Sequence, residues 1–198
     1  DQRPHALVAQ AVREADLPFE EEVIPLDTQA ATTRLPEVSP SGRVPALEVD
    51  ETLTIWDSLA IAEWVTETTD VGWPRDPTRR AIARSACAEM HSGFSALRRA
   101  MPMDLHGRHP TPPIEGELSR DIRRVLSLWE SLRARAASGP YLLGEWTHVD
   151  SFFAPVVTRF VTYGVDLPDF ARAYSDLVLA RPSVQVWFAD AKADPWRL

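Results

Sequence analysis

The sequence predicts a mixed α/β part followed by an all-helical part. Short runs of apolar and β-branched residues between turn formers, which are typical of strands, occur only before residue 57. From residue 76 onward, apolar residues recur at helical spacing instead. Residues 70–77 (DVGWPRDP) carry glycine and proline and separate two helical patterns. We therefore expect two domains, residues 1–69 and residues 76–198.

The composition excludes several classes of protein. A net charge of −8 argues against nucleic-acid binding, which needs basic surface to neutralise phosphate. Cys87 is the single cysteine of the sequence, which excludes an internal disulfide framework and favours a reducing compartment. No apolar run approaches the roughly 20 residues of a membrane span, and no signal peptide is visible. We expect a cytoplasmic protein that binds neither nucleic acid nor membrane.

The first forty residues predict a helix, a short strand and a loop. Apolar residues recur near the helical period over residues 1–16, and a proline ends that run. Residues 19–26 (FEEEVIPL) can form a short strand, which Pro25 restricts to an edge or an end of a sheet. Residues 27–40 are polar with two prolines, so they predict a loop with at most a short helix around residues 29–35.

A hairpin and a capped helix follow, and the rest of the chain is organised around them. Two strands are predicted over residues 44–49 and 52–56, with a tight loop between them. Pro45 cannot donate a ladder hydrogen bond, so it lies at an edge, at a strand start or in a cis turn. Asp57 or Ser58 is the predicted N-cap of a helix that runs to about residue 68. The free backbone N–H groups at such a helix start favour a carboxylate.

After the boundary, every predicted element is a helix. Thr147 and Asp150 have the spacing of a capping box, in which two side chains satisfy backbone donors at a helix start. Such a box is common, so it marks the fold rather than a functional site. The helices are expected at residues 76–100, 117–137, 147–163, 167–180 and 183–193, with a proline-rich loop at residues 101–116.

Taken in order, these motifs resemble those of the cytosolic glutathione transferases. The motifs are Arg43-Val44-Pro45-Ala46-Leu47, Asp57-Ser58-Leu59-Ala60-Ile61 and Thr147-His148-Val149-Asp150. Each is weak alone, but their order and spacing are specific, and the resemblance spans residues 8–196. Residues 86–103 (ACAEMHSGFSALRRAMPM) look like a bacterial branch of this family with zeta-class character. The resemblance implies a thioredoxin-like N-terminal domain, an all-helical C-terminal domain and a homodimer.

The resemblance also implies a glutathione site. Pro45 would be a cis-proline that leaves the backbone of Val44 free to pair with the cysteinyl part of glutathione. Asp57 and Ser58 would hold the γ-glutamyl end, with the Ser58 hydroxyl and helix N–H groups on its carboxylate. Arg43 stands where relatives often carry a basic residue near the glycyl or cysteinyl segment. Asp57 and Ser58 could instead be a plain N-cap, but a proline upstream at this spacing favours the binding role.

The sequence does not identify the residue that activates the thiol. In this family a Ser, Tyr or Cys near the start of the first helix donates a hydrogen bond to the glutathione sulfur and lowers the pKa of its thiol. No Ser, Tyr or Cys occurs before Thr28, so we expect the first strand and the catalytic loop to precede Asp1. The alternative is that His5 or Arg3 takes this role.

The expected function is glutathione transfer, in which the thiolate of the substrate glutathione attacks a small electrophile. Met90, His91 and Arg98 could line the electrophile pocket, or belong to an ordinary interdomain or dimer-facing helix. His106 and His109 have no nearby Cys or acidic ligand in this prediction, so no metal is expected. The alternatives are a glutathione-dependent cis–trans isomerase of the maleylacetoacetate type and a non-catalytic glutathione-binding module.

Overall fold

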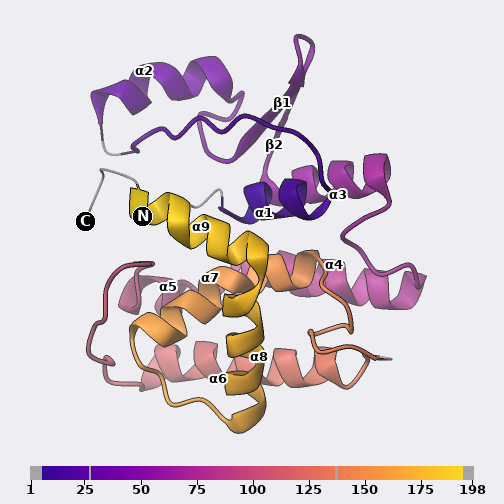
Figure 1. Cartoon of the computed structure of the whole chain (residues 1–198). Coiled ribbons are helices and arrows are strands. Elements are labelled where there is room, and N and C mark those ends of the chain that lie inside the picture. The colour runs from indigo at the N-terminus through magenta and orange to yellow at the C-terminus, as the bar shows by residue number, and fades with distance from the viewer. Residues whose placement is uncertain (1–5, 27, 137, 194–198) are drawn as a thin grey trace.

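The computed structural model describes residues 6–26, 28–136 and 138–193 of the chain. The N-terminal part contains α1 (Ala6–Glu14), α2 (Gln29–Val38), β1 (Ala46–Asp50), β2 (Leu53–Trp56) and α3 (Ser58–Thr69). The helical part contains α4 (Pro77–Ser92), α5 (Ser95–Ala100), α6 (Gly116–Arg133), α7 (His148–Thr162), α8 (Asp169–Ala180) and α9 (Pro182–Ala193). Figure 1 shows the N-terminal part at the top and the helical part below, with α1 and α9 between them. The predicted order of an α/β part and an all-helical part is confirmed.

The predicted hairpin forms and packs with α1 on α3. β1 and β2 pair antiparallel, with Ala46 opposite Trp56 at the open end of the hairpin. The Asp50 carboxylate shapes the loop at the other end, because its Oδ1 accepts hydrogen bonds from the backbone N–H groups of Thr52 (2.7 Å) and Leu53 (3.0 Å). A small core lies beneath, built from Val8 and Val12 of α1 and from Ile61 and Val65 of α3.

Two predictions for residues 19–40 are wrong. Residues 19–26 form no strand, because no strand in the described part of the chain pairs with them, and an extended segment without a partner cannot satisfy its backbone by a ladder. The expected loop instead contains α2, which is longer than the short helix anticipated around residues 29–35. Thr28 caps this helix, since its Oγ1 accepts a hydrogen bond from the backbone N–H of Ala31 (3.2 Å).

The helical part surrounds one large core. Trp129 of α6 is fully buried and makes edge contacts with the rings of Phe153, Phe160 and Tyr174, at centroid distances of 5.9, 5.8 and 4.8 Å. Burial of such aromatic side chains supplies much of the stability of a helical domain. Cys87 is also fully buried in this core, which raises the pKa of its thiol. Cys87 is therefore a free cysteine that packs as a small buried hydrophobe.

The single helix predicted over residues 76–100 is wrong, because the structure divides it into α4 and α5. The break falls at Gly93 and Phe94, and Phe94 adopts the left-handed conformation with a φ of 57°. Arg98 stabilises the end of α4, because its guanidinium donates to the carbonyl oxygens of Met90 (2.6 Å) and Gly93 (3.2 Å). In the described ranges, every helix is too short or too polar to cross a bilayer.

Asp150 fixes the start of α7. Its carboxylate accepts hydrogen bonds from the backbone N–H of Thr147 (2.8 Å), the Thr147 hydroxyl (3.1 Å), the backbone N–H of Leu142 (3.2 Å) and the Tyr174 hydroxyl (3.2 Å). The predicted capping box is therefore present. Because the carboxylate is completely buried, its pKa is raised to about 6.

His148, the first residue of α7, joins the helical part to the N-terminal part. Its backbone N–H donates to the carbonyl oxygen of Gly72 (2.8 Å), and its Nε2 lies 3.0 Å from the Thr66 hydroxyl of α3. The ring packs edge-on against Trp73, with 4.8 Å between centroids. Burial lowers the pKa of His148 to about 4. The imidazole is thus neutral in the folded protein at ordinary pH.

Acid should weaken this contact between the two parts. The pKa of His148 is about 4 in the folded protein, against about 6.5 in an unfolded chain. Unfolding therefore takes up a proton in this interval, so the contribution of the neutral ring is complete above about pH 6.5 and is lost as the pH falls toward about 4. The loss amounts to about 3 kcal/mol.

The measurement must separate His148 from Asp150, whose raised pKa gives the opposite pH dependence because the folded state then binds the proton more tightly. A His148→Gln variant keeps Asp150 and lacks the titrating ring. Urea unfolding of both proteins should show the stability of the wild type falling by about 3 kcal/mol relative to the variant between about pH 7 and about pH 4. A difference independent of pH would contradict a neutral buried ring.

Candidate functional site

The candidate site lies at the open end of the hairpin. The register pairs Ala46 with Trp56, so Pro45 precedes one member of this pair and Asp57 follows the other. The hairpin therefore brings the Val44-Pro45 segment and the N-terminus of α3 to the same end of the sheet. This is the juxtaposition that the sequence prediction requires.

The peptide bond between Val44 and Pro45 is cis, as predicted. Both residues line a groove of about 880 Å³, which is also lined by β1 and by residues 17–22. Val8 and Val12 of α1 contribute to the lining, which makes the groove partly apolar. In the part of the chain that the structure describes, the backbone of Val44 has no hydrogen-bond partner, so its N–H and C=O can pair with a ligand.

Asp57 caps α3. Its Oδ1 accepts a hydrogen bond from the backbone N–H of Leu59 (2.8 Å), and its backbone has a φ of 76°. A residue other than glycine rarely adopts a positive φ, and where it does the surrounding structure holds it there. The predicted N-cap at Asp57 or Ser58 is thus resolved in favour of Asp57, and Ser58 is the first helical residue.

Ser58 and Asp57 both contact His91, the penultimate residue of α4. The Ser58 hydroxyl lies 3.3 Å from His91 Nδ1, and His91 Nε2 lies 2.9 Å from Asp57 Oδ2. Ser58 is buried, at 5% exposure, whereas the side chains of Asp57 and His91 remain 44% and 39% exposed. Solvent and a ligand can therefore reach the carboxylate and the imidazole.

The other residues of the predicted electrophile pocket lie elsewhere. Met90 is buried in the core of the helical part. The Arg98 guanidinium is directed at carbonyl oxygens at the end of α4, including that of His91 (3.3 Å), and burial lowers its pKa. Of the three residues, the structure brings only the His91 side chain to the N-terminus of α3. An electrophile-binding role for Met90, His91 and Arg98 stays a prediction.

The remaining candidates are readily placed. Arg43 is exposed close to the cis bond, and its backbone N–H donates to the Ser39 hydroxyl (3.3 Å). His5 and Arg3 lie outside the described residues. The expectation that His109 has no acidic neighbour is wrong, because its Nε2 lies 2.8 Å from Asp104 Oδ2. Even so, no group of three or more potential metal ligands forms among the described residues.

The contact between His91 and the start of α3 was missed at the level of sequence. The helical spacing places His91 on a helix, but it gives no information on which face meets the N-terminal part. Thirty-three positions separate Ser58 from His91, and only the packing of α4 alongside α3 brings them together. The Arg98 contact was missed for a related reason, since the break at Gly93 folds α5 back toward the end of α4.

Comparisons with known proteins show what the chain is similar to. Residues 8–68 match the family model described as the N-terminal domain of glutathione S-transferase. A probable maleylacetoacetate isomerase of Caenorhabditis elegans is 28% identical over 167 residues, covering 82% of this chain and 76% of the relative. A solved glutathione transferase homolog from Burkholderia, with bound glutathione, gives a TM-score of 0.73 at 25% identity, covering 98% of this chain and 95% of that chain.

A second solved structure is that of maleylpyruvate isomerase, described as a bacterial zeta-class glutathione S-transferase. It gives a TM-score of 0.71 at 21% identity, covering 98% of this chain and 94% of that chain. Over residues 8–68 the chain is similar to the N-terminal domain of glutathione S-transferases, and over nearly its whole length it is similar in fold to solved glutathione transferases. At 21% identity, the likeness to the maleylpyruvate isomerase shows the fold alone.

Proposed function

We propose that this chain binds glutathione across the end of the hairpin and promotes the attack of its thiolate on a small electrophile. The observation that carries the proposal is the meeting of Val44-Pro45 with the capped N-terminus of α3, within the segment that matches the family model. A homolog with the same fold has been solved with bound glutathione. Glutathione is a substrate in this proposal, and no metal takes part.

Each end of the tripeptide has a partner in the site. The γ-glutamyl carboxylate is bound by the Ser58 hydroxyl and by backbone N–H groups of α3, where the helix dipole favours negative charge. Asp57, which is half exposed, faces the positively charged α-amino group of the same residue. The backbone of Val44 pairs with the cysteinyl residue beside the groove, and Arg43 attracts the carboxylate of the glycyl end.

The thiol is expected near the start of α1. The positive end of the α1 dipole favours a thiolate there, and the activating residue is sought ahead of α1, either before Asp1 or at His5. A thiolate is the reactive form of the sulfur, so the contribution of the protein is to lower the thiol pKa and to position the electrophile. Met90, His91 and Arg98 are the candidates for the electrophile side.

A second candidate function is cis–trans isomerisation. Both the relative from C. elegans and one of the structural neighbours are isomerases by description. In such a reaction the glutathione thiolate adds to a conjugated double bond and leaves again after rotation, so glutathione is regenerated. Assays of a cis-dienone dicarboxylate and of an aromatic halide, each with glutathione, distinguish the two activities, because only the halide consumes the thiol.

The proposed binding role of Ser58 predicts a loss of affinity in Ser58→Ala. The variant lacks one hydrogen bond to a carboxylate, so we expect it to bind glutathione roughly tenfold more weakly. Titration calorimetry measures this affinity. Ser85→Ala is the matched control, because the Ser85 hydroxyl donates to a carbonyl oxygen on an exposed face of α4. Unchanged affinity in Ser58→Ala would remove Ser58 from the site. Absence of binding by the wild type would contradict the proposed function.

We also propose that the domains extend over residues 1–69 and 76–198, that the protein is cytoplasmic and that it forms a homodimer. Relatives with the same fold and a similar length support the domain division. Light scattering coupled to gel filtration tests the dimer directly.

A further inference from the structure

His91 bridges the two side chains at the N-terminus of α3. Its Nε2 is 2.9 Å from a carboxylate oxygen of Asp57, and its Nδ1 is 3.3 Å from the Ser58 hydroxyl. The bridge joins the helical part to the N-terminal part at the position where a ligand carboxylate is proposed to bind. What this bridge does when a ligand arrives follows from the position of the ring proton.

The contacts fix the tautomer of a neutral ring. A carboxylate only accepts hydrogen bonds, so the proton of a neutral His91 ring lies on Nε2 and is donated to Asp57. Nδ1 is then a bare acceptor, and the Ser58 hydroxyl donates its single hydrogen to it. In this state the hydroxyl hydrogen is directed at His91 and not at the ligand site.

A bound carboxylate needs that same hydrogen. If the Ser58 hydroxyl turns to donate to the ligand, a neutral His91 ring leaves two acceptors, Nδ1 and the Ser58 oxygen, facing each other. A proton on Nδ1 removes the conflict, since the imidazolium donates to the Ser58 oxygen on one side and to Asp57 on the other. The positive ring also lies beside the negative charge of the ligand.

We propose that His91 is a positioning residue that takes up a proton when a carboxylate binds to Ser58. The proposal rests on the proposed glutathione site. It makes glutathione affinity rise as the pH is lowered, because binding then takes up a proton.

The other charged groups around His91 are engaged elsewhere. On α4, Glu89 pairs with Arg124 of α6 (2.6 Å) and Arg84 pairs with Glu63 of α3. From α5 the Arg98 guanidinium faces the carbonyl oxygen of His91, and its charge also acts on Arg159 of α7. Asp57 is thus the acidic side chain that contacts the ring in the described part of the chain.

Proton uptake can be measured directly by titration calorimetry. S-methylglutathione is the probe, because it keeps the γ-glutamyl carboxylate and has no thiol proton to lose. Binding heats in two buffers of different ionisation enthalpy, between about pH 6 and about pH 8, give the number of protons taken up. We expect net uptake by the wild type, and an affinity that falls by up to about tenfold per pH unit as uptake approaches one proton.

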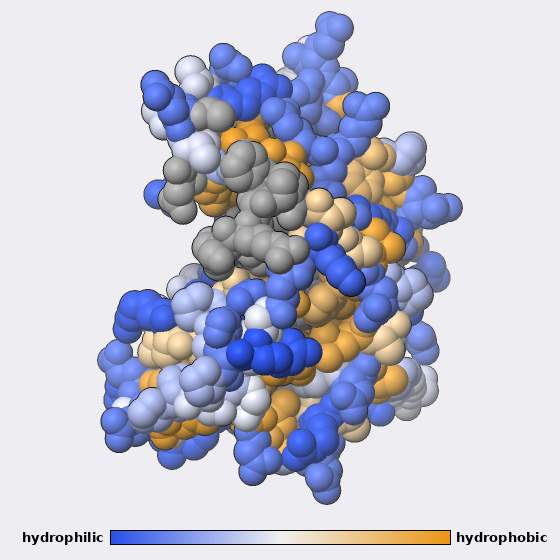
Figure 2. Space-filling view, turned by 60° about the vertical axis from the view of Figure 1, so that its left-hand side comes forward, coloured by the Kyte–Doolittle hydropathy of each residue, from blue (hydrophilic) through white to orange (hydrophobic). Residues whose placement is uncertain are grey.

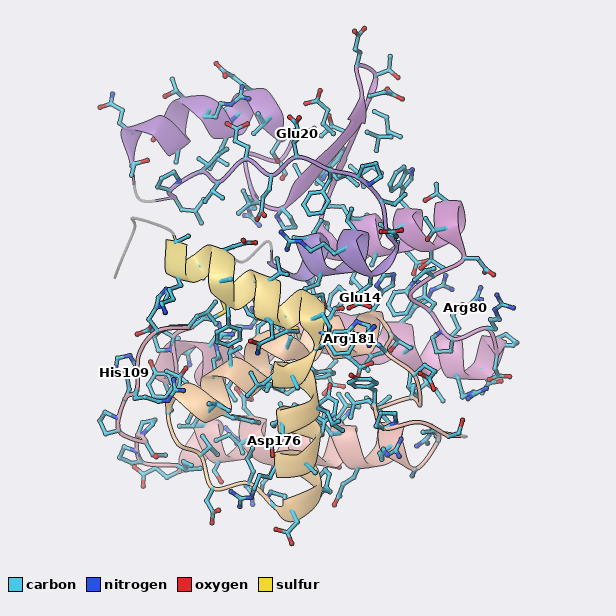
Figure 3. All side chains as sticks on the ribbon, viewed as in Figure 1. Glu14, Glu20, Arg80, His109, Asp176 and Arg181 are labelled. Carbon is cyan, nitrogen blue, oxygen red and sulfur yellow. The ribbon has the colours of Figure 1, made fainter. Side chains whose placement is uncertain are left out.

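His91→Gln should bind without proton uptake and with an affinity independent of pH, and His91→Asn is the second variant should the first be poorly folded. His109→Gln is the matched control, because His109 forms a similar pair with Asp104 at 2.8 Å, on the side of the helical part away from α3 (Figure 3). It should behave as the wild type. Uptake that persists in both His91 variants, or wild-type binding without uptake, overturns the proposal. Absence of any binding overturns the proposed function instead.

Discussion

Asp150→Ala should cost about 4 kcal/mol of the free energy of unfolding, measured by urea or thermal unfolding. The carboxylate is fully buried and accepts four hydrogen bonds. Alanine leaves the backbone N–H groups of Thr147 and Leu142 and the Tyr174 hydroxyl without an acceptor, and each buried unpaired donor costs about 1–3 kcal/mol. The loss of the helix cap adds to this cost.

Asp176→Ala is the control for this prediction. Asp176 lies on α8, as Tyr174 does, but it is exposed (Figure 3). Its substitution should change the stability by less than about 0.5 kcal/mol. If Asp150→Ala were as stable as the control, the network at the start of α7 would not contribute to the fold.

Gly72→Ala should cost more than about 3 kcal/mol. Gly72 has a φ of 109°, and a Cβ placed there would lie 2.0 Å from Nε2 of His148. The imidazole cannot move aside cheaply, because it is buried and contacts Thr66 and Trp73. Backbone strain and overpacking therefore act together.

Gly116→Ala separates these two effects. Gly116 also has a positive φ, 53°, but nothing lies within 4 Å of a Cβ at that position. Its substitution should show only the strain, about 1–2 kcal/mol. A Gly72→Ala variant no less stable than Gly116→Ala in thermal unfolding would mean that the ring of His148 is free to move.

Much of this architecture could be read from local patterns. The hairpin, α3 and α6 follow from periodicity and turn chemistry, and Thr147 with Asp150 marked the start of α7 correctly. These elements are encoded by residues near one another in the chain. Packing then reinforces a preference that is already local.

The wrong predictions concern segments whose secondary structure depends on residues far away in the sequence. Residues 19–26 have the composition of a strand, but a strand needs a neighbour, and composition does not say whether one is present. The interruption at Gly93 and Phe94 depends on where α5 must pack, and apolar spacing continued through it unbroken. The unexpected length of α2 has the same origin, since a helix with an internal proline is favoured only weakly by its own residues.

The candidate site could likewise be predicted only where its residues are close together in the sequence. Pro45 and Asp57 could be predicted because both belong to one short hairpin whose register brings them together. The interaction of His91 with Ser58 could not, because it depends on the packing of one half on the other. Figure 2 shows hydrophobic residues at the surface among hydrophilic ones over both halves. Composition alone therefore does not indicate which residues of one half contact the other.

The position of α1 has a consequence for how the molecule comes apart. This helix packs on α3 in the N-terminal half and on α7 and α9 in the helical half. Its last residue, Glu14, pairs with Arg181 (Figure 3). Glu14 also accepts a hydrogen bond from Ser183 at the start of α9. Because α1 packs on both halves, neither half can unfold without removing packing contacts from the other. The boundary at residues 70–75 is therefore not a place where the two halves unfold separately. The two halves should melt as one cooperative unit.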